Sequence, residues 1–539
     1  MPIPLYERHE HWPAPKPIPT GVSTEQQGAS LSVQTVTGAG WIIGWRMVTR
    51  SLGLVSTFVL VRFLLPGDFG LVALAGSFSQ AVDWLSDFGV TEALIRDHDR
   101  DRELYDTGFT VNLVRGVAMG VIIAAGAWPV ALFFGDMRLV PILLVIAASM
   151  AAGGLENIGT VDFRRDLAFD KEFRLFVLPR IVSIAAAILF AVTFANYWAL
   201  VVGIVINRTG RVVMSYAMHP YRPRITLAGW RRLIGFSAWS WSIGMVAMVR
   251  DRLDAVVIGR VLGPGSVGIF AIGWEIGMLT STELVEPLCR ALLSGFSAAR
   301  RAGTTVAKPY LDVIAATFLL TLPMGFGLSL AAAPIVRLTL GPHWMAAVPL
   351  VQIFALVGML KVIGMISGTL CTTFGLLAVQ FRIALVSTIV RFTLLVLLVG
   401  RFGVVGGAVA AMGSFVVEET YYLVVTFRHF ELRVLDLFRS TWRPIVASGC
   451  MVGALLLEGT AWAPADGDLA PLLGKLALTV LTGAAAYGVS LAAIWAVAGR
   501  PDGAETYLLG LARNTLGHLI AGRRRAPTAD AVRLPPAAG

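Results

Sequence analysis

The sequence predicts an all-helical, polytopic integral membrane protein with about fourteen transmembrane helices, built from two similar halves. Three observations predict this fold class. Hydrophobic residues make up 56% of the 539 positions, and the mean hydropathy is +0.73, well above that of soluble domains. The apolar residues fall in runs long enough to cross a bilayer. A short motif also recurs in the two halves, as in many secondary transporters.

The apolar runs account for the number of helices. A transmembrane helix needs about 20 apolar residues, and about fourteen such runs follow one another. Two pairs of runs meet at Asn196 and at Gly403, where one long run is hardest to divide. The predicted segments are 39–64, 69–94, 108–134, 139–160, 173–194, 197–217, 233–261, 266–293, 309–333, 346–374, 380–400, 404–427, 442–461 and 471–498.

The internal repeat relates residues 60–73 to residues 258–271. Six of these fourteen positions are identical, each 198 residues after its counterpart. Each copy lies in the short turn between two apolar segments, and six segments separate the copies. Because six is even, both copies face the same side of the membrane and the repeat is parallel. The identical pairs are Arg62 and Arg260, Leu64 and Leu262, Pro66 and Pro264, Gly67 and Gly265, Gly70 and Gly268, and Ala73 and Ala271.

The basic residues predict the orientation. The net charge is +10, but no DNA- or RNA-binding signature accompanies it, so we expect no nucleic-acid partner. The basic residues occupy alternate loops, which the positive-inside rule places in the cytoplasm together with both termini. These loop residues are Arg96, Arg100, Arg102, Arg164, Arg165, Lys171, Arg174, Arg222, Arg224, Arg231, Arg232, Arg300, Arg301, Lys308, Arg428, Arg433, Arg439 and Arg443.

Charged side chains deep in a span are costly, so they mark candidate sites. Arg46 and Arg50 lie four residues apart, on one face of the first segment. Arg250 and Asp254 have the same spacing in the seventh segment, with Arg252 between them. These arginines offer charge-assisted, bidentate bonds to an anionic group such as phosphate. Two structural alternatives stay open: Arg46 snorkelling to the interface, and an intrahelical ion pair of Arg250 with Asp254.

Acidic side chains share this region of the membrane. Glu275 and Glu283 lie on one stripe of the eighth segment, together with Glu286 and Arg290. Glu275 has no local partner in the sequence, whereas Glu286 and Arg290 are spaced to pair with each other. We therefore expect Glu275, Glu283 and Asp254 to be the candidates for carrying a coupling proton or sodium ion.

The sequence lacks motifs for metal-assisted or nucleotide-driven chemistry. Walker A, HExxH and CxxC patterns are absent, and the three cysteines lie in or beside apolar spans, where they act as small apolar residues. The outer loops near 334–346 and 462–470 are too short to hold the catalytic acids of a membrane glycosyltransferase or polymerase. We expect no cofactor, no metal site and no enzyme activity.

Several motifs, taken in order, indicate a family. They are LVRFLLPGDFGLVALAGSF (60–78), SDFGVTEALIRD (86–97), ELYDTGFTVNLVRG (103–116), VDFRRDLAFDKEF (161–173), NYWALV (196–201), LDAVVIGRVLGPGSVGIFAIG (253–273) and LGPHWMAAVPLVQIFAL (340–356). This series, spread over residues 39–430, resembles the Wzx-type lipopolysaccharide and exopolysaccharide flippases. Those proteins belong to the multidrug/oligosaccharidyl-lipid/polysaccharide exporter superfamily.

The resemblance implies two six-helix lobes with two extra C-terminal helices, in the cytoplasmic membrane of a bacterium. It implies the export of an undecaprenyl-diphosphate-linked oligosaccharide by ion- or potential-driven alternating access, with Arg46, Arg50, Arg250 and Arg252 holding the diphosphate. Besides membrane lipids, a polysaccharide polymerase and glycosyltransferases are the implied partners. A drug or organic-cation antiporter of the same superfamily is the alternative, against which the arginines of the lumen argue. A polytopic glycosyltransferase or polymerase is the more distant alternative.

These expectations give a division of the chain. The expected parts are a disordered cytoplasmic tail (1–37), a first lobe (38–217), a cytoplasmic inter-lobe loop (218–232), a second lobe (233–429), a two-helix appendage (430–499) and a second cytoplasmic tail (500–539).

Overall fold

The computed structural model describes residues 47–85, 94, 101–166, 168–230, 238–462 and 468–499. The regular elements in these ranges are all helices. The two predicted tails lie outside the described residues, and so does Arg46.

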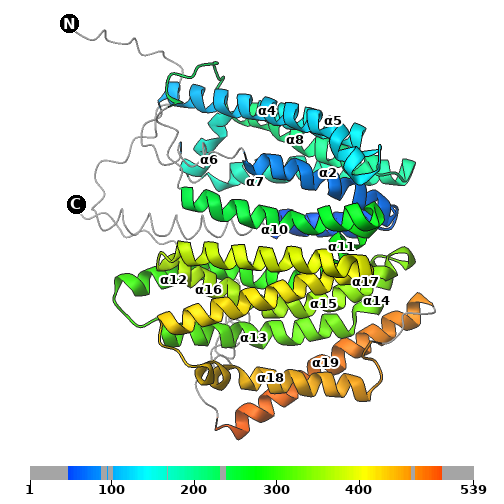
Figure 1. The fold of residues 1–539 in the computed structure, drawn as a ribbon, viewed down its shortest axis with the longest axis vertical. Helices are drawn as coiled ribbons and strands as arrows, with labels where there is room; N and C mark the ends of the chain where they lie inside the picture. Colours follow the sequence, from blue (N-terminus) through cyan, green and yellow to red (C-terminus); the bar gives the residue numbers. More distant parts are fainter. Residues whose placement is uncertain are drawn as a thin grey trace, which may run out of the picture.

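The first half of the chain forms a series of helices (Figure 1). Its elements are a helix at Met47–Leu60, α2 (Pro66–Leu85), α4 (Arg102–Phe134), α5 (Leu139–Gly153), η1 (Ile158–Thr160), α6 (Val161–Arg165), α7 (Phe169–Phe194) and α8 (Trp198–Met218).

The second half repeats this arrangement and adds two helices. Its elements are α10 (Ala238–Leu262), α11 (Pro264–Gly277), η2 (Ser281–Val285), α12 (Glu286–Arg301), α13 (Ala307–Leu330), α14 (Ala332–Thr339), η3 (Pro342–Ala347), α15 (Val348–Leu360), α16 (Val362–Thr373), α17 (Leu377–His429), α18 (Val434–Leu457) and α19 (Leu469–Val497).

Several of these helices can span a bilayer. Within the described ranges, 8 helices are long and apolar enough to cross a membrane. The count rises to 9 if α5 and the segment Ile158–Arg165, which meet at a bend of 68°, are taken as one span. The chain is therefore an all-helical polytopic membrane protein. Of the first predicted segment, 39–64, the structure describes residues from Met47 on, and they begin with an apolar helix at Met47–Leu60.

Two predicted segments are broken in the structure. Segment 266–293 consists of α11, the π-helical turn η2 and α12, and segment 346–374 is divided at Lys361 into α15 and α16. Broken helices are tolerated at membrane depth only where protein or a water-filled cavity satisfies the freed backbone groups. The break in α11–α12 lies beside the cavity described below.

Two other predicted segments, 380–400 and 404–427, fall within α17. This 53-residue element contains a non-helical residue, Gly403, with φ 60° and ψ −141°. Side chains with a Cβ rarely adopt this conformation, which explains a glycine at the turn. Gly413 faces the side chain of Leu394 across the turn, so the two parts of α17 fold back on each other.

The two halves meet along α2, α10 and α11. Helix α2 packs against α10 and α11, and α10 packs against α17. One buried cluster passes through this contact and includes Leu71 and Leu74 of α2, Ile258 of α10 and Leu350 of α15. Lipid tails are as apolar as leucine, so the close fit of these side chains, rather than their removal from water, stabilises the contact. Helices α18 and α19 pack on each other and on α13 (Figure 1).

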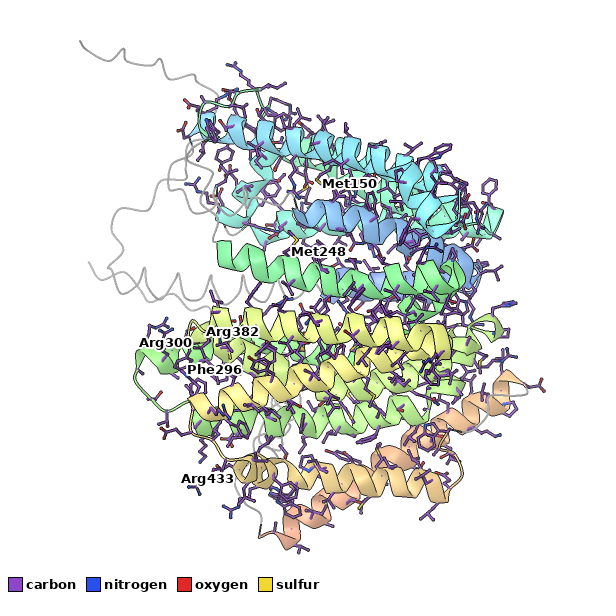
Figure 2. The ribbon with its side chains drawn as sticks, viewed as in Figure 1. Met150, Met248, Phe296, Arg300, Arg382 and Arg433 are labelled. Carbon is purple, nitrogen blue, oxygen red and sulfur yellow. The ribbon has the colours of Figure 1, made fainter. Side chains whose placement is uncertain are left out.

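Arginines gather at one end of the second half. Figure 2 shows Arg300, Arg382 and Arg433 at the end of the molecule opposite to α14. Arg300 and Arg433 belong to two of the loops that the sequence predicts to be cytoplasmic.

The segment that follows α8, residues 219–230, is hydrogen-bonded to α4 of the first half. The buried carboxylate of Asp106 on α4 accepts hydrogen bonds from the Tyr221 hydroxyl and from the backbone N–H of Arg224, the latter at 2.8 Å. The N–H of Thr226 donates to the hydroxyl of Thr110 at 2.9 Å. Burial, and then the neighbouring carboxylate, raise the pKa of Tyr221, so its hydroxyl stays a donor. This part of the inter-lobe loop therefore moves with the first half.

Candidate functional site

A cavity of about 450 Å³ lies between the helix at Met47–Leu60, α7, α8 and the region of η2 and α12. Its walls carry four arginines and two glutamates, with methionine, threonine, asparagine, phenylalanine and proline between them. The charged lining residues are Arg50, Arg180, Arg211, Arg290, Glu283 and Glu286. Among the described lining residues, four cations face two anions, which makes the cavity suitable for an anion.

Arg180 is the most available cation of this cavity. It follows Pro179 inside α7 and points toward the Met47–Leu60 helix, where Gly53 leaves room: a Cβ at Gly53 would lie 3.1 Å from the Arg180 Nη2 atom. Arg180 has no hydrogen-bond or ion-pair partner among the described residues. Its charge does interact with Glu275. An unpaired guanidinium in a half-buried cavity is poised for a negatively charged ligand.

Arg50 is paired, but its partner is exchangeable. Its Nε donates to the Glu283 carboxylate, and the two side chains remain 45% and 32% exposed. Ion pairs with this exposure contribute about 0–1 kcal/mol, so a bound anion can displace Glu283 at little cost. The structure thus brings together two predicted site residues, Arg50 and Glu283, which lie 233 positions apart in the sequence.

Arg211 of α8 separates the cavity from a second one. Its guanidinium lies 6.0 Å from the Phe176 ring, and its Nε is buried without a hydrogen-bond partner among the described residues. Arg211 and Phe176 also line a cavity of about 330 Å³ within the first half, where the Asp83–Arg115 and Arg164–Glu172 pairs lie at 2.7 and 2.6 Å. Arg211 therefore lines both cavities.

The acids predicted on the eighth segment fall into two groups. Glu275 on α11 is half-buried, makes no hydrogen bond or ion pair with a described residue, and interacts with the charges of Arg50 and Arg180. Glu286 instead pairs with Arg290 at 2.8 Å. The local pairing that the spacing allowed for Glu286 and Arg290 is thus present, while Glu275 and Glu283 share the arginines of the cavity.

The two arginines predicted on the seventh segment, Arg250 and Arg252, lie outside this cavity in the structure. The Arg250 Nη1 lies 2.9 and 3.0 Å from the two carboxylate oxygens of Glu418 on α17, and its Nε is 3.5 Å from Asp251. The Arg252 Nη2 donates to Gln80 of α2 at 2.5 Å. Neither is among the described residues that line the 450 Å³ cavity.

Asp254 belongs to a closed ion pair. Both of its oxygens accept hydrogen bonds from Arg391 of α17, from Nε at 3.0 Å and from Nη2. Asp254 and Arg391 are 5% and 2% exposed. The alternative of an intrahelical Arg250–Asp254 pair is therefore wrong, because each residue binds a partner on α17. In this conformation a coupling cation would first have to displace the Arg391 guanidinium.

The interior of the second half holds two further cations among aromatic rings. The Arg391 guanidinium carbon lies 5.5 Å from the Trp274 ring and 5.3 Å from the Phe415 ring. The Lys361 Nζ lies 6.0 and 5.3 Å from the same two rings. Such placement over ring faces stabilises a cation by about 0.5–2 kcal/mol. Here the cations are satisfied by the protein itself.

Arg211 and Arg391 are not among the site residues predicted from the sequence, and Arg180, a cation within a predicted span, is a candidate there only by its depth. Each is an arginine inside an apolar segment, which is the signal available in the sequence. The segment count cannot say which of them faces a cavity.

The comparisons with known proteins address the family directly. Residues 59–349, more than half of the chain, match the family described as "Polysaccharide biosynthesis protein". The chain belongs to this family. The Wzx-type resemblance predicted from the motifs is thereby confirmed.

Several relatives match this chain at low sequence identity but over most of its length. The lipopolysaccharide biosynthesis protein WzxC of Escherichia coli (strain K12) is 21% identical over 427 residues, which is 78% of this chain and 85% of that protein. The teichuronic acid biosynthesis protein TuaB of Bacillus subtilis (strain 168) is 20% identical, over 62% of this chain and 70% of its own length. The succinoglycan biosynthesis transport protein ExoT of Rhizobium meliloti (strain 1021) is 22% identical, over 61% and 67%.

Solved structures share the fold. The lipid II flippase MurJ in an inward closed conformation superposes with a TM-score of 0.67 over 85% of this chain and 99% of that chain, at 13% identity. An inward-facing multidrug resistance MATE family transporter of the MOP superfamily gives a TM-score of 0.54 over 71% and 94%, at 16% identity. At these identities the likeness shows the fold alone, which this chain shares with both transporters.

Proposed function

We propose that this protein is a flippase that moves an undecaprenyl-diphosphate-linked oligosaccharide outward across the bacterial cytoplasmic membrane, for the synthesis of exopolysaccharide, capsule or O-antigen. One observation carries the proposal: the 450 Å³ cavity holds Arg180, which has no ion-pair partner among the described residues, beside the weakly paired Arg50. The family description and the names of WzxC, ExoT and MurJ support a polysaccharide or lipid-linked sugar as the substrate class.

The diphosphate is the group that these arginines would hold. Guanidinium groups bind phosphate oxygens through two parallel hydrogen bonds, and a half-buried site strengthens the attraction relative to bulk water. In this proposal Arg180 and Arg50 are the primary contacts and Arg211 is a third. Arg46 remains a candidate on the same helix face as Arg50. Arg250 and Arg252 take second place, because each is occupied by Glu418 or Gln80.

The proposed topology has fourteen spans in two six-helix lobes, 38–217 and 233–429, followed by the pair at 430–499. The gathering of Arg300, Arg382 and Arg433 at one end supports an orientation with that end and both termini in the cytoplasm (Figure 2). The two halves would move relative to each other, so that the cavity opens first to the cytoplasm and then to the outside. A polymerase and glycosyltransferases would act on the substrate before and after export.

The membrane potential is the proposed source of energy. Moving an anion outward across an inside-negative membrane is favourable by about 2.3 kcal/mol per charge per 100 mV. A coupling proton or sodium ion would act on Glu275 or Glu283, which face the same arginines. When that ion leaves, the carboxylate regains its charge, competes with the substrate for the arginines and helps to release it. Asp254 is a weaker candidate because Arg391 already donates hydrogen bonds to both of its carboxylate oxygens. Glu275→Gln is expected to reduce the response to an ion gradient more than substrate binding.

The experiment is transport of a lipid-linked sugar by the purified protein in liposomes. Arg180→Ala should lower the transfer rate about 10- to 100-fold, the loss expected for one charge-assisted contact of 1.5–3 kcal/mol. Arg439→Ala, which removes an exposed arginine of α18, is the control and should transfer at the parent rate. Equal rates for both variants would refute the cationic cavity. Transport of organic cations instead of the sugar would favour the antiporter.

A further inference from the structure

The internal repeat lies at the contact between the two halves. Helices α2 and α11 begin at the repeated prolines, Pro66 and Pro264, and they pack closely against each other. The contact is reciprocal. A Cβ on Gly70 would overlap the carbonyl oxygen of Pro264, and a Cβ on Gly268 would overlap the carbonyl oxygen of Pro66. The first turns of the two helices therefore touch through backbone atoms.

The repeated arginines also reach across this contact. Arg62, which precedes α2, donates from Nε to the carbonyl oxygen of Thr339 at 2.9 Å and from Nη2 to that of Leu338, both at the end of α14. Arg260, its counterpart at the end of α10, places its guanidinium carbon 5.6 Å from the Phe133 ring at the end of α4. Each copy thus binds the opposite half.

A third contact joins the same regions. The Trp344 Nε1 donates to the carbonyl oxygen of Val61 at 3.2 Å, and its ring stands edge-on to Phe69 at 5.4 Å. Trp344 is fully buried. Water is therefore excluded from the contact between the Trp344 ring and the first copy of the repeat.

This contact lies to one side of the cavity. Arg50 of the cavity and Leu60 belong to one helix, so the rise of 1.5 Å per residue places them about 15 Å apart along its axis. A backbone-to-backbone contact is rigid, because no side chain can rotate out of the way. It can part only if the two halves move as bodies, as in a two-state transition of packed elements.

We propose that the two copies of the repeat form the outer closure of the transport path: α2 and α11 meet at Gly70 and Gly268 when the cavity is shut to the outside, and they separate when it opens outward. The inference rests on the alternating access and the orientation proposed above. It assigns a role to the pairs Arg62/Arg260, Pro66/Pro264 and Gly70/Gly268, which the anion site does not use.

The test measures how fast an impermeant maleimide, added outside intact cells, labels a cysteine in the cavity. The reporter is Thr282→Cys in a chain carrying Cys289→Ser, Cys371→Ala and Cys450→Ser, since Thr282 lines the cavity. Gly70→Ala and Gly268→Ala each force the halves apart, so labelling should rise about tenfold, as overpacking of this size does to a two-state equilibrium.

The repeat supplies its own matched controls. Gly67 and Gly265 are three residues earlier in the same helices, and a Cβ there would meet nothing within 4 Å. Gly67→Ala and Gly265→Ala should label at the parent rate. If Gly70→Ala and Gly268→Ala label no faster than these controls, the closure is elsewhere. Faster labelling only in inside-out vesicles would place this end in the cytoplasm and would also overturn the proposal.

A second variant covers the case in which the alanine variants do not reach the membrane. Arg62→Ala removes the bonds to α14 without adding atoms, and it should raise labelling several-fold; parent-like labelling would refute the closure. The measurement needs no substrate. If the lipid-linked sugar is not transported but the labelling contrast stands, the proposed function fails and the closure does not.

Discussion

Arg180 of the first half and Arg391 of the second half are both arginines inside apolar helices, but their surroundings differ. Arg180 lines a cavity and has no hydrogen-bond or ion-pair partner among the described residues. Arg391 is 2% exposed, bonds both oxygens of Asp254 and lies beside two aromatic rings. The comparison teaches that an intramembrane arginine indicates a ligand site only when the protein has left its charge unneutralised.

The largest expected difference between the surroundings of Arg391 and those of Arg180 is in their contribution to the free energy of unfolding. Asp254→Ala leaves the Arg391 charge buried and unpaired, which should lower the free energy of unfolding by about 3–5 kcal/mol. The midpoint of thermal unfolding in detergent would fall, whereas Arg180→Ala should leave it unchanged or raise it. Replacing Asp254 and Arg391 together by leucine should recover most of the loss. An unaffected midpoint in Asp254→Ala would mean that the two arginines are alike.

A smaller effect should appear in anion binding, measured by calorimetry with inorganic pyrophosphate. Arg180→Ala is expected to weaken binding about 10- to 100-fold, because a charge-assisted bond is lost. Arg250→Ala should change it by less than about threefold, because Glu418 already occupies that guanidinium. The distinction between the two halves would disappear if both variants lost affinity equally.

The smallest effect concerns the exchangeable pair. Glu283→Gln frees Arg50 from its competing carboxylate, so pyrophosphate should bind up to about fivefold more tightly, in line with an exposed ion pair of 0–1 kcal/mol. Release should slow in proportion. Glu286→Gln is a useful comparison, since Glu286 pairs with Arg290 at 2.8 Å and not with Arg50. Weaker binding in Glu283→Gln would show that Glu283 helps to hold the anion site together.

Sequence reasoning reached the helices and part of the site. Long apolar runs predict helices because the bilayer demands them, and the turn at Gly403 follows from a single glycine. Arg50 and Glu283 were found because both are charged deep in a span. The partners of Arg250 and Asp254 were not predictable, since Glu418 and Arg391 lie 168 and 137 residues away. Helical periodicity reports neighbours on one helix and nothing about the next.

The contact at Gly70 and Gly268 has a consequence for how the two halves can diverge. Each glycine lies against a backbone carbonyl of the other copy. A larger side chain at this position in one half would therefore clash with the backbone of the other half. After a duplication, most positions of the halves are free to drift apart, but these positions constrain each other. The six identities by which the repeat is recognised in the sequence include Pro66/Pro264 and Gly70/Gly268, the residues at which the halves touch.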